Sequence, residues 1–123
     1  MSMNDLVSDF VARVNNAITA EQDSVSVLKN NIVVNTTKKL VKLGYFHSFE
    51  DGEREITIEL NPSKIKKLTR MSKPGRRLYV SYVKFPRVMS GIGWNIISTS
   101  KGIMTNFEAK NNKVGGELMF QIV

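Results

Sequence analysis

The chain has 123 residues with 41% hydrophobic and 24% charged residues, which fits one globular domain or two small ones. It has no cysteine and no apolar run near the roughly 20 residues of a membrane span, which excludes disulfides, thiolate metal sites and a spanning helix. Eighteen basic against eleven acidic residues give a formal charge of +7, which favours a polyanion, and nucleic acid over a membrane surface.

The first predicted element is a helix over residues 4–20, because apolar residues recur there at helical spacing. Asp5 and Asp9 lie near its N-terminus, where the helix dipole favours carboxylates. The apolar positions, which we expect to be core, are Leu6, Val7, Phe10, Val11, Val14, Ala17 and Ile18. Serine and valine then alternate over residues 24–27, which predicts a short strand.

Residues 31–43 fit either a strand or a helix. Asn31 to Thr37 are poor helix formers, so propensity alone favours a strand. Against this, Val33 and Leu40 lie on one helical face, and Gly44 is placed as a C-cap. We therefore predict a helix.

A β-hairpin is predicted over residues 45–60, with an Asp-Gly turn at 51–52 and alternating apolar residues over 56–60. The first part of the chain is then α-β-α-β-β, with helices on one face of a sheet. His47, the sole histidine, lies in this hairpin without a partner in a motif. We expect it to be packed or solvated rather than catalytic.

The charge changes sign at the Asn-Pro pair 61–62, where we place a domain boundary. Residues 1–62 carry six basic and nine acidic residues, a net charge of −3. Residues 63–123 carry twelve and two, a net charge of +10. Nine basic residues and no acidic one occur from Lys64 to Arg87. Because solvated faces usually mix both signs, this stretch is predicted to be a binding surface.

After the boundary, residues 65–71 and 77–83 are predicted to be strands that pair with each other through a Pro-Gly turn at 74–75. Pro86 can open a short helix that runs to Ser90. The second half is therefore predicted to be rich in sheet, with most of its basic residues on strands and loops.

A polar turn follows between two apolar pairs at 96–97 and 103–104. Its members are Ser98, Thr99, Ser100, Lys101 and Gly102. The β-branched flanks favour strands, and the polar cluster ending in glycine favours a tight loop. Hydroxyls, an ammonium group and open backbone amides suit phosphate and sugar oxygens better than bond breaking. The alternative is an ordinary strand–turn–strand with a polar tip.

The last predicted elements are a short helix and a closing strand. Thr105 and Glu108 have the spacing of a capping box, Gly115 and Gly116 should end the helix, and residues 117–123 form the strand. Together the elements predict an α+β fold of two small domains. Residues 1–62 form the α-β-α-β-β domain, and residues 63–123 form a mostly β domain with short helices.

Catalytic motifs are weak or missing. Residues 91–93 begin like a dinucleotide fingerprint, but isoleucine replaces its third glycine. Ser100 beside Lys101 resembles a nucleophile with its base, yet neighbours on an extended loop point apart. Beyond Glu108 and Glu117 the basic half has no carboxylates. We therefore predict that the protein is not an enzyme and binds no cofactor, metal or small-molecule substrate. A small nuclease and a general RNA chaperone remain as alternative functions.

The second half resembles protein eight of the small ribosomal subunit, in its bacterial and organellar form. The matching motifs are Ser-Lys-Pro-Gly-Arg at 72–76, Tyr79, Pro-Arg-Val-Met-Ser-Gly-Ile-Gly at 86–93, Ile-Ser-Thr-Ser-Lys-Gly-Ile-Met-Thr at 97–105 and Val-Gly-Gly-Glu at 114–117. The first half agrees at residues 3–5, 16–17 and 40–45, so the likeness spans nearly the full length.

The resemblance implies direct binding to the central domain of small-subunit rRNA, at an irregular internal loop of a hairpin. It implies RNA contacts by the turn at residues 98–102, with Glu117 and Tyr79 nearby. It also implies neighbouring small-subunit ribosomal proteins as partners. The basic residues expected to neutralise phosphates are Lys66, Lys67, Arg70, Lys73, Arg76, Arg77 and Arg87.

The first domain departs from the family pattern. The family usually has Asp-Pro where this chain has Asp5-Leu6, and an extra arginine where residues 13–17 have Asn15. Residues 29–32 lack the usual Pro/Ser-rich cap and basic residues. These changes weaken the RNA contacts expected of that domain.

The Asn/Lys/Ile-rich composition suggests the ribosome of an organelle, and a mitochondrion before the alternatives of a plastid or the bacterial cytoplasm. The N-terminus lacks signal and import patterns, so we expect synthesis where the chain works.

Overall fold

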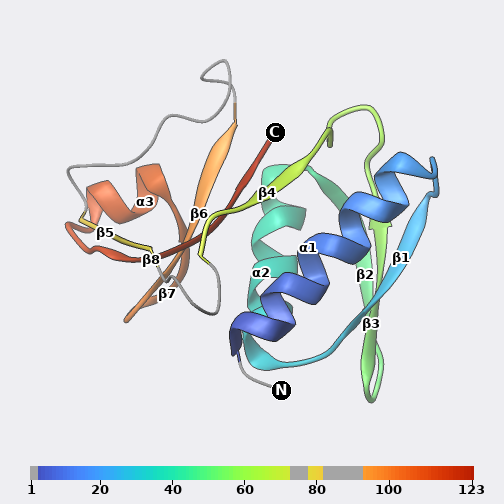
Figure 1. Cartoon of the computed structure of the whole chain (residues 1–123), viewed down its shortest axis with the longest axis horizontal. Helices are drawn as coiled ribbons and strands as arrows, with labels where there is room; N and C mark the ends of the chain where they lie inside the picture. Colours follow the sequence, from blue (N-terminus) through green and yellow to red (C-terminus); the bar gives the residue numbers. More distant parts are fainter. Residues whose placement is uncertain (1–2, 73–77, 82–92) are drawn as a thin grey trace. The chain divides into compact units, whose positions relative to one another are not determined.

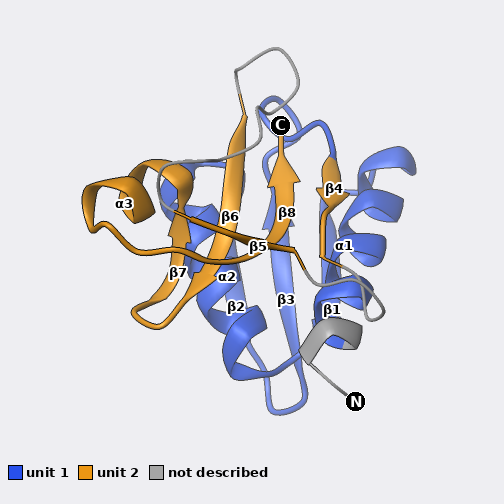
Figure 2. Ribbon diagram, turned by 60° about the vertical axis from the view of Figure 1, so that its left-hand side comes forward, with its two compact units in different colours: residues 1–67 blue, residues 68–123 orange. Residues whose placement is uncertain are grey.

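The computed structural model describes residues 3–72, 78–81 and 93–123 and divides the chain into two compact units. Unit 1 comprises Met1–Lys67 and unit 2 comprises Leu68–Val123 (Figure 2). The elements labelled in Figure 1 are α1 (Met3–Thr19), β1 (Ser24–Leu28), α2 (Asn31–Leu43), β2 (Phe46–Asp51), β3 (Glu55–Leu60), β4 (Leu68–Arg70), β5 (Tyr79–Val80), β6 (Trp94–Thr99), β7 (Gly102–Thr105), α3 (Asn106–Asn111) and β8 (Gly116–Ile122). The predicted α+β class is confirmed.

Unit 1 extends past residue 62, where the sequence placed the boundary. The amides of Lys64 and Ile65 donate to the Asn61 carbonyl at 3.1 and 3.0 Å, and Ile65 is buried. The Asn61 amide in turn donates to the Tyr45 carbonyl at 3.0 Å. The residues that follow the Asn-Pro pair are therefore tied to unit 1, and the division falls after Lys67.

The sheet of unit 1 has the antiparallel order β1-β3-β2, with α1 and α2 on one face (Figure 1). Along β3 the side chains of Ile56, Ile58 and Leu60 are buried, while the polar residues between them are exposed. This alternation is what a strand with one covered face requires. The α-β-α-β-β order and the hairpin predicted over residues 45–60 are confirmed.

Helix α2 forms despite its β-branched sequence because both of its ends are capped. The Asn30 side chain accepts a hydrogen bond from the Val33 amide at 2.7 Å, as an N-cap does. Gly44 has a φ of +88°, a left-handed conformation that glycine adopts without strain. The Lys64 ammonium donates to the Leu43 carbonyl at 2.5 Å, which satisfies one more helix-end acceptor. The helix prediction is confirmed.

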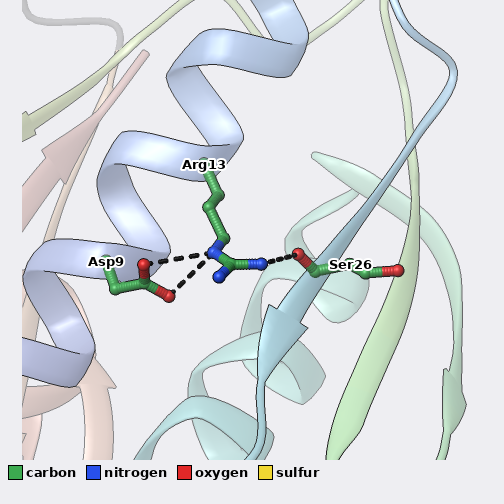
Figure 3. Close-up of polar contacts among 3 residues, drawn as sticks. All are labelled: Asp9, Arg13 and Ser26. Atoms are coloured by element: carbon green, nitrogen blue, oxygen red, sulfur yellow. Dashed lines mark hydrogen bonds and ion pairs between the residues drawn. The ribbon is translucent and has the colours of Figure 1, made fainter.

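Helix α1 is held to the sheet by packing and by one arginine. Its buried residues follow the predicted apolar stripe, and Phe10 meets the Phe46 ring edge-on with centroids 6.3 Å apart. The Arg13 Nε lies 3.1 and 3.0 Å from the two carboxylate oxygens of Asp9, and its Nη1 donates to the Ser26 carbonyl at 3.2 Å (Figure 3). Arg13 thereby joins α1 to β1.

The sheet of unit 2 has the order β4-β8-β6-β7, and β5 also pairs with β8. The predicted pairing of residues 65–71 with 77–83 is wrong for the residues that the structure describes. Strand β4 lies opposite Phe120 to Ile122 and β5 lies opposite Gly116 and Glu117. Because β6 occupies the other edge of β8, β4 and β5 follow one another along the same edge. The turn at 74–75 and the helix from Pro86 fall outside the described residues.

Helix α3 begins with the predicted capping box. The Glu108 amide donates to the Thr105 hydroxyl oxygen at 3.3 Å, and the Thr105 amide donates to the Glu108 carboxylate at 3.3 Å. The helix ends at Asn111, earlier than the predicted stop at Gly115, because Asn112 caps it with its amide and with an Nδ2–H that donates to the Glu108 carbonyl at 2.8 Å. The predicted short helix and closing strand are confirmed.

Candidate nucleic-acid interface

The polar turn at residues 98–102 is the end of the β6–β7 hairpin. Ser98 pairs with Ile103 and Thr99 pairs with Gly102, which leaves Ser100 and Lys101 as a two-residue turn. Gly102 has a φ of +112° and open space on the side where a Cβ would stand. Backbone conformation, rather than crowding, therefore requires glycine at this position. The strand–turn–strand alternative describes the backbone correctly.

Thr99 differs from its neighbours at the hairpin tip, which we define as residues 98–102. Its hydroxyl donates to the Gly102 carbonyl at 2.8 Å and accepts from the Lys101 amide at 3.1 Å. Thr99 therefore closes the turn, and its hydroxyl proton is already used within the chain. Ser100 and Lys101 are exposed, and Ser98 is half-buried.

Tyr79 and Glu117 lie in one row with Ser98 at the base of the tip. Tyr79 on β5 is the direct partner of Glu117 on β8, and Glu117 is the direct partner of Ser98 on β6. Direct partners of an antiparallel pair project from the same face of the sheet. The Tyr79 side chain is 65% exposed, whereas Glu117 is only 5% exposed. The structure thus brings these three residues together beside the turn.

The two glycines before Glu117 allow this close arrangement. A Cβ on Gly116 would overlap the carbonyl oxygen of Ser98 on β6. A Cβ on Gly115 would lie 2.5 Å from the carbonyl oxygen of Val80 on β5. Each of these Cβ-to-oxygen distances would be shorter than van der Waals contact. The absence of a Cβ at both glycines therefore allows β8 to lie between β5 and β6.

The basic residues predicted to bind phosphates are spread over both units. Lys66 and Lys67 are exposed near the end of unit 1. Arg70 on β4 is half-buried, and its Nε donates to the Ser72 carbonyl at 2.6 Å. Lys73, Arg76, Arg77 and Arg87 fall outside the described residues.

Residues 68–123 contain two acidic side chains, and neither is fully exposed. Glu108 is half-buried and held in the capping box, and Glu117 is buried. Lys101, Lys110 and Lys113 are exposed on the same unit. The described surface of unit 2 therefore presents exposed lysines and no exposed acidic side chain, which suits a polyanion.

The described residues hold no cluster of three or more His, Cys, Asp or Glu side chains that could hold a metal ion. His47 lies exposed on β2, in line with a solvated rather than a packed histidine. No helix in the described part of the chain is both long and apolar enough to cross a membrane.

The half-buried Trp94 and the exposed Phe107 form an aromatic pair that the sequence alone does not predict. The rings of Trp94 and Phe107 meet at 81° with centroids 5.2 Å apart, and Phe107 is 58% exposed. The signal was present in the hairpin register. Ile96 pairs with Thr105 in an antiparallel hairpin. The residue two positions before Ile96, Trp94, therefore comes opposite the residue two positions after Thr105, Phe107.

Comparison with known proteins covers nearly the whole chain. The model of the family described as Ribosomal protein S8 matches residues 5–123. Proteins named small ribosomal subunit protein uS8 from Brucella melitensis biotype 1, Brucella abortus (strain S19) and Brucella ovis are each 38% identical to the chain over 131 aligned positions. Each alignment covers 99% of this chain and 99% of the relative. The resemblance read from the sequence is confirmed: the chain belongs to the ribosomal protein S8 family.

Proposed function

We propose that this protein is a structural, non-enzymatic constituent of the small ribosomal subunit. It binds the central domain of small-subunit rRNA directly and aids the assembly and stability of that domain. Its family membership and the names of its bacterial relatives support the ribosomal role. We assign the RNA contacts to residues 63–123, which hold most of the positive charge.

The observation that carries this proposal is the row of Tyr79, Glu117 and Ser98 at the base of the hairpin tip. Tyr79 of this row is exposed and Ser98 is half-buried, while Glu117 is buried on the strand between them, and Ser100 and Lys101 are exposed in the adjoining turn. Hydroxyl groups can donate to and accept from the 2′-hydroxyls and base edges of a wide, shallow RNA minor groove. The row and the exposed turn residues supply the specificity for the RNA, and Thr99 and Gly102 shape the turn.

The affinity comes mainly from phosphate neutralisation. Lysine and arginine side chains that contact phosphates release counterions, which strengthens binding without reading sequence. Lys66 and Lys67 are exposed and suit this role, and Arg70 contributes where its guanidinium remains accessible. The residues assigned to it from the sequence alone are Lys73, Arg76, Arg77 and Arg87.

Other small-subunit ribosomal proteins are the further partners in this proposal, as the family implies. The protein is located wherever its ribosome works. The composition favours the ribosome of an organelle, and a mitochondrion before a plastid. Because the matched relatives are bacterial, a plastid and the bacterial cytoplasm are the alternatives.

The test is a titration of the full chain into a labelled hairpin from the central domain of small-subunit rRNA, with a scrambled hairpin as control. We expect saturable binding with a clear preference for the native hairpin, and intact RNA after incubation with Mg²⁺. Equal affinity for both hairpins would identify a general RNA chaperone instead. Cleavage of the RNA would identify a nuclease.

A further inference from the structure

The aromatic pair of the half-buried Trp94 and the exposed Phe107 lies at the end of the β6–β7 hairpin opposite its tip. Trp94 begins β6, and Phe107 lies in the first turn of α3, directly after β7. At about 3.3 Å per residue, the strand places Trp94 about 20 Å from Ser100. The pair is therefore a surface feature separate from the tip and from the row at its base.

This aromatic pair is fixed in place by hydrogen bonds on the neighbouring residues. The Asn95 amide donates to the Asn106 side-chain oxygen at 3.2 Å, and Gln121 donates from Nε2 to the Asn95 side-chain oxygen at 2.9 Å. Asn95 itself is 2% exposed. The first turn of α3 is thus tied to β6, and the Phe107 ring is supported on one side by Trp94. A ring held in this way loses little conformational freedom when a ligand binds.

The charge around the pair selects the ligand. Lys110 is exposed on α3 one turn after Phe107, and Lys113 is exposed just beyond the helix. Glu108, the neighbour of Phe107, is held in the capping box with Thr105. An aromatic ring among cations suits a nucleobase, whose face stacks on the ring while its phosphates approach the ammonium groups.

We propose that Phe107, supported by Trp94, is a stacking platform for an unpaired base of the RNA that the hairpin tip binds. The inference rests on the proposed rRNA binding and adds a second contact to it. The tip reads the RNA at one end of the β6–β7 hairpin, and the platform holds a base at the other end. A single RNA that engages both points must span about 20 Å of protein surface along the strand.

Trp94 is the only tryptophan in the chain, so its fluorescence reports on this site alone. The probe is the central-domain hairpin of small-subunit rRNA, titrated into the full chain and into the variants Phe107→Leu and Phe107→Tyr. We expect the native chain to change its Trp94 emission on binding. Phe107→Leu keeps an apolar side chain but no ring, and should weaken binding roughly tenfold. Phe107→Tyr keeps the ring and should bind as the native chain does.

A change on the RNA side leaves the protein intact and tests the same contact. Abasic substitutions are placed one at a time at the unpaired positions of the hairpin. One of them should abolish the Trp94 change and weaken binding to the extent that Phe107→Leu does. If no abasic substitution has this effect, or if the Trp94 emission changes when a ribosomal protein is added and not when RNA is added, the stacking proposal fails while rRNA binding stands. If the native chain does not bind the hairpin at all, the proposed function itself fails.

Discussion

Ser98 on β6 and Glu117 on β8 are direct partners across the sheet, and Glu117 pairs on its other side with Tyr79. Carboxylate oxygens accept hydrogen bonds, so Glu117 suits hydroxyl or amino donors rather than phosphate oxygens. Glu117 is 5% exposed and Tyr79 is 65% exposed. In the proposed complex Tyr79 therefore offers the larger contact surface, and Glu117 supports the row beneath it.

The first prediction concerns Ser100, which is exposed in the two-residue turn. Ser100→Ala should cost roughly 1–3 kcal/mol of binding to the native hairpin, because one hydroxyl contact is lost and its RNA partner is left unpaired. Titration of native and scrambled hairpins measures the loss. Ser24→Ala, at an exposed serine of unit 1, is the matched control and should bind as the native chain does. An equal loss on both RNAs would contradict a role in specificity.

A second prediction separates phosphate binding from readout. Lys66→Ala should lower the slope of log affinity against log salt by about one and weaken native and scrambled RNA alike. The measurement is a titration at several salt concentrations. Lys38→Ala, at an exposed lysine of α2, removes the same charge elsewhere and should leave the slope unchanged. If both variants lower the slope equally, the effect reflects net charge alone.

The third prediction follows from the close approach of β8 to β6. Gly116→Ala should destabilise the chain by roughly 1–3 kcal/mol, because the new methyl group overlaps the Ser98 carbonyl and the strands must separate. Urea unfolding measures the free energy, and amide shifts of Ser98 and Glu117 report the lost pairing. Gly102→Ala is the contrast, since its Cβ would stand in open space and only the φ of +112° opposes it. If the amide chemical shifts of Ser98 and Glu117 were unchanged in Gly116→Ala, β6 and β8 would not be constrained at this position.

A fourth prediction tests the capping box of α3. Thr105→Ala removes the hydroxyl oxygen that accepts from the Glu108 amide and should cost about 1–2 kcal/mol of stability. Thr105→Ser keeps that oxygen and should lose clearly less. Chemical denaturation of both variants gives the comparison. Equal losses would assign the effect to packing of the buried Thr105 methyl group instead of the cap.

Local structure was largely predictable from the sequence. The stripe of α1, the alternation of β3 and the capping box of α3 each follow from short-range spacing, and the structure confirms them. The hardest case was α2, where strand propensity and helical periodicity disagreed. Its caps at Asn30 and Gly44 decided the outcome, because they satisfy helix-end groups that propensity does not count.

Long-range pairing was not predictable in the same way. The apolar patterns around β4 and β5 indicate strands but do not name a partner, and both strands pair with β8, far away in sequence. The contact of Trp94 with Phe107 is more local, but it depends on the register of the β6–β7 hairpin, which the sequence analysis does not assign. The sequence alone predicts a ligand donor at the Thr99 hydroxyl, because the hydrogen bond from this hydroxyl to the Gly102 carbonyl depends on the geometry of the turn.

The Thr99 hydroxyl has a consequence for how a complex would form. Because it bridges the Gly102 carbonyl and the Lys101 amide, the tip holds its shape before any partner arrives. A preorganised tip needs no ordering step on encounter, so the structural adaptation falls on the nucleic acid. An RNA loop that must distort to fit would then set the pace of association, and stiffening that loop, rather than the protein, would slow it.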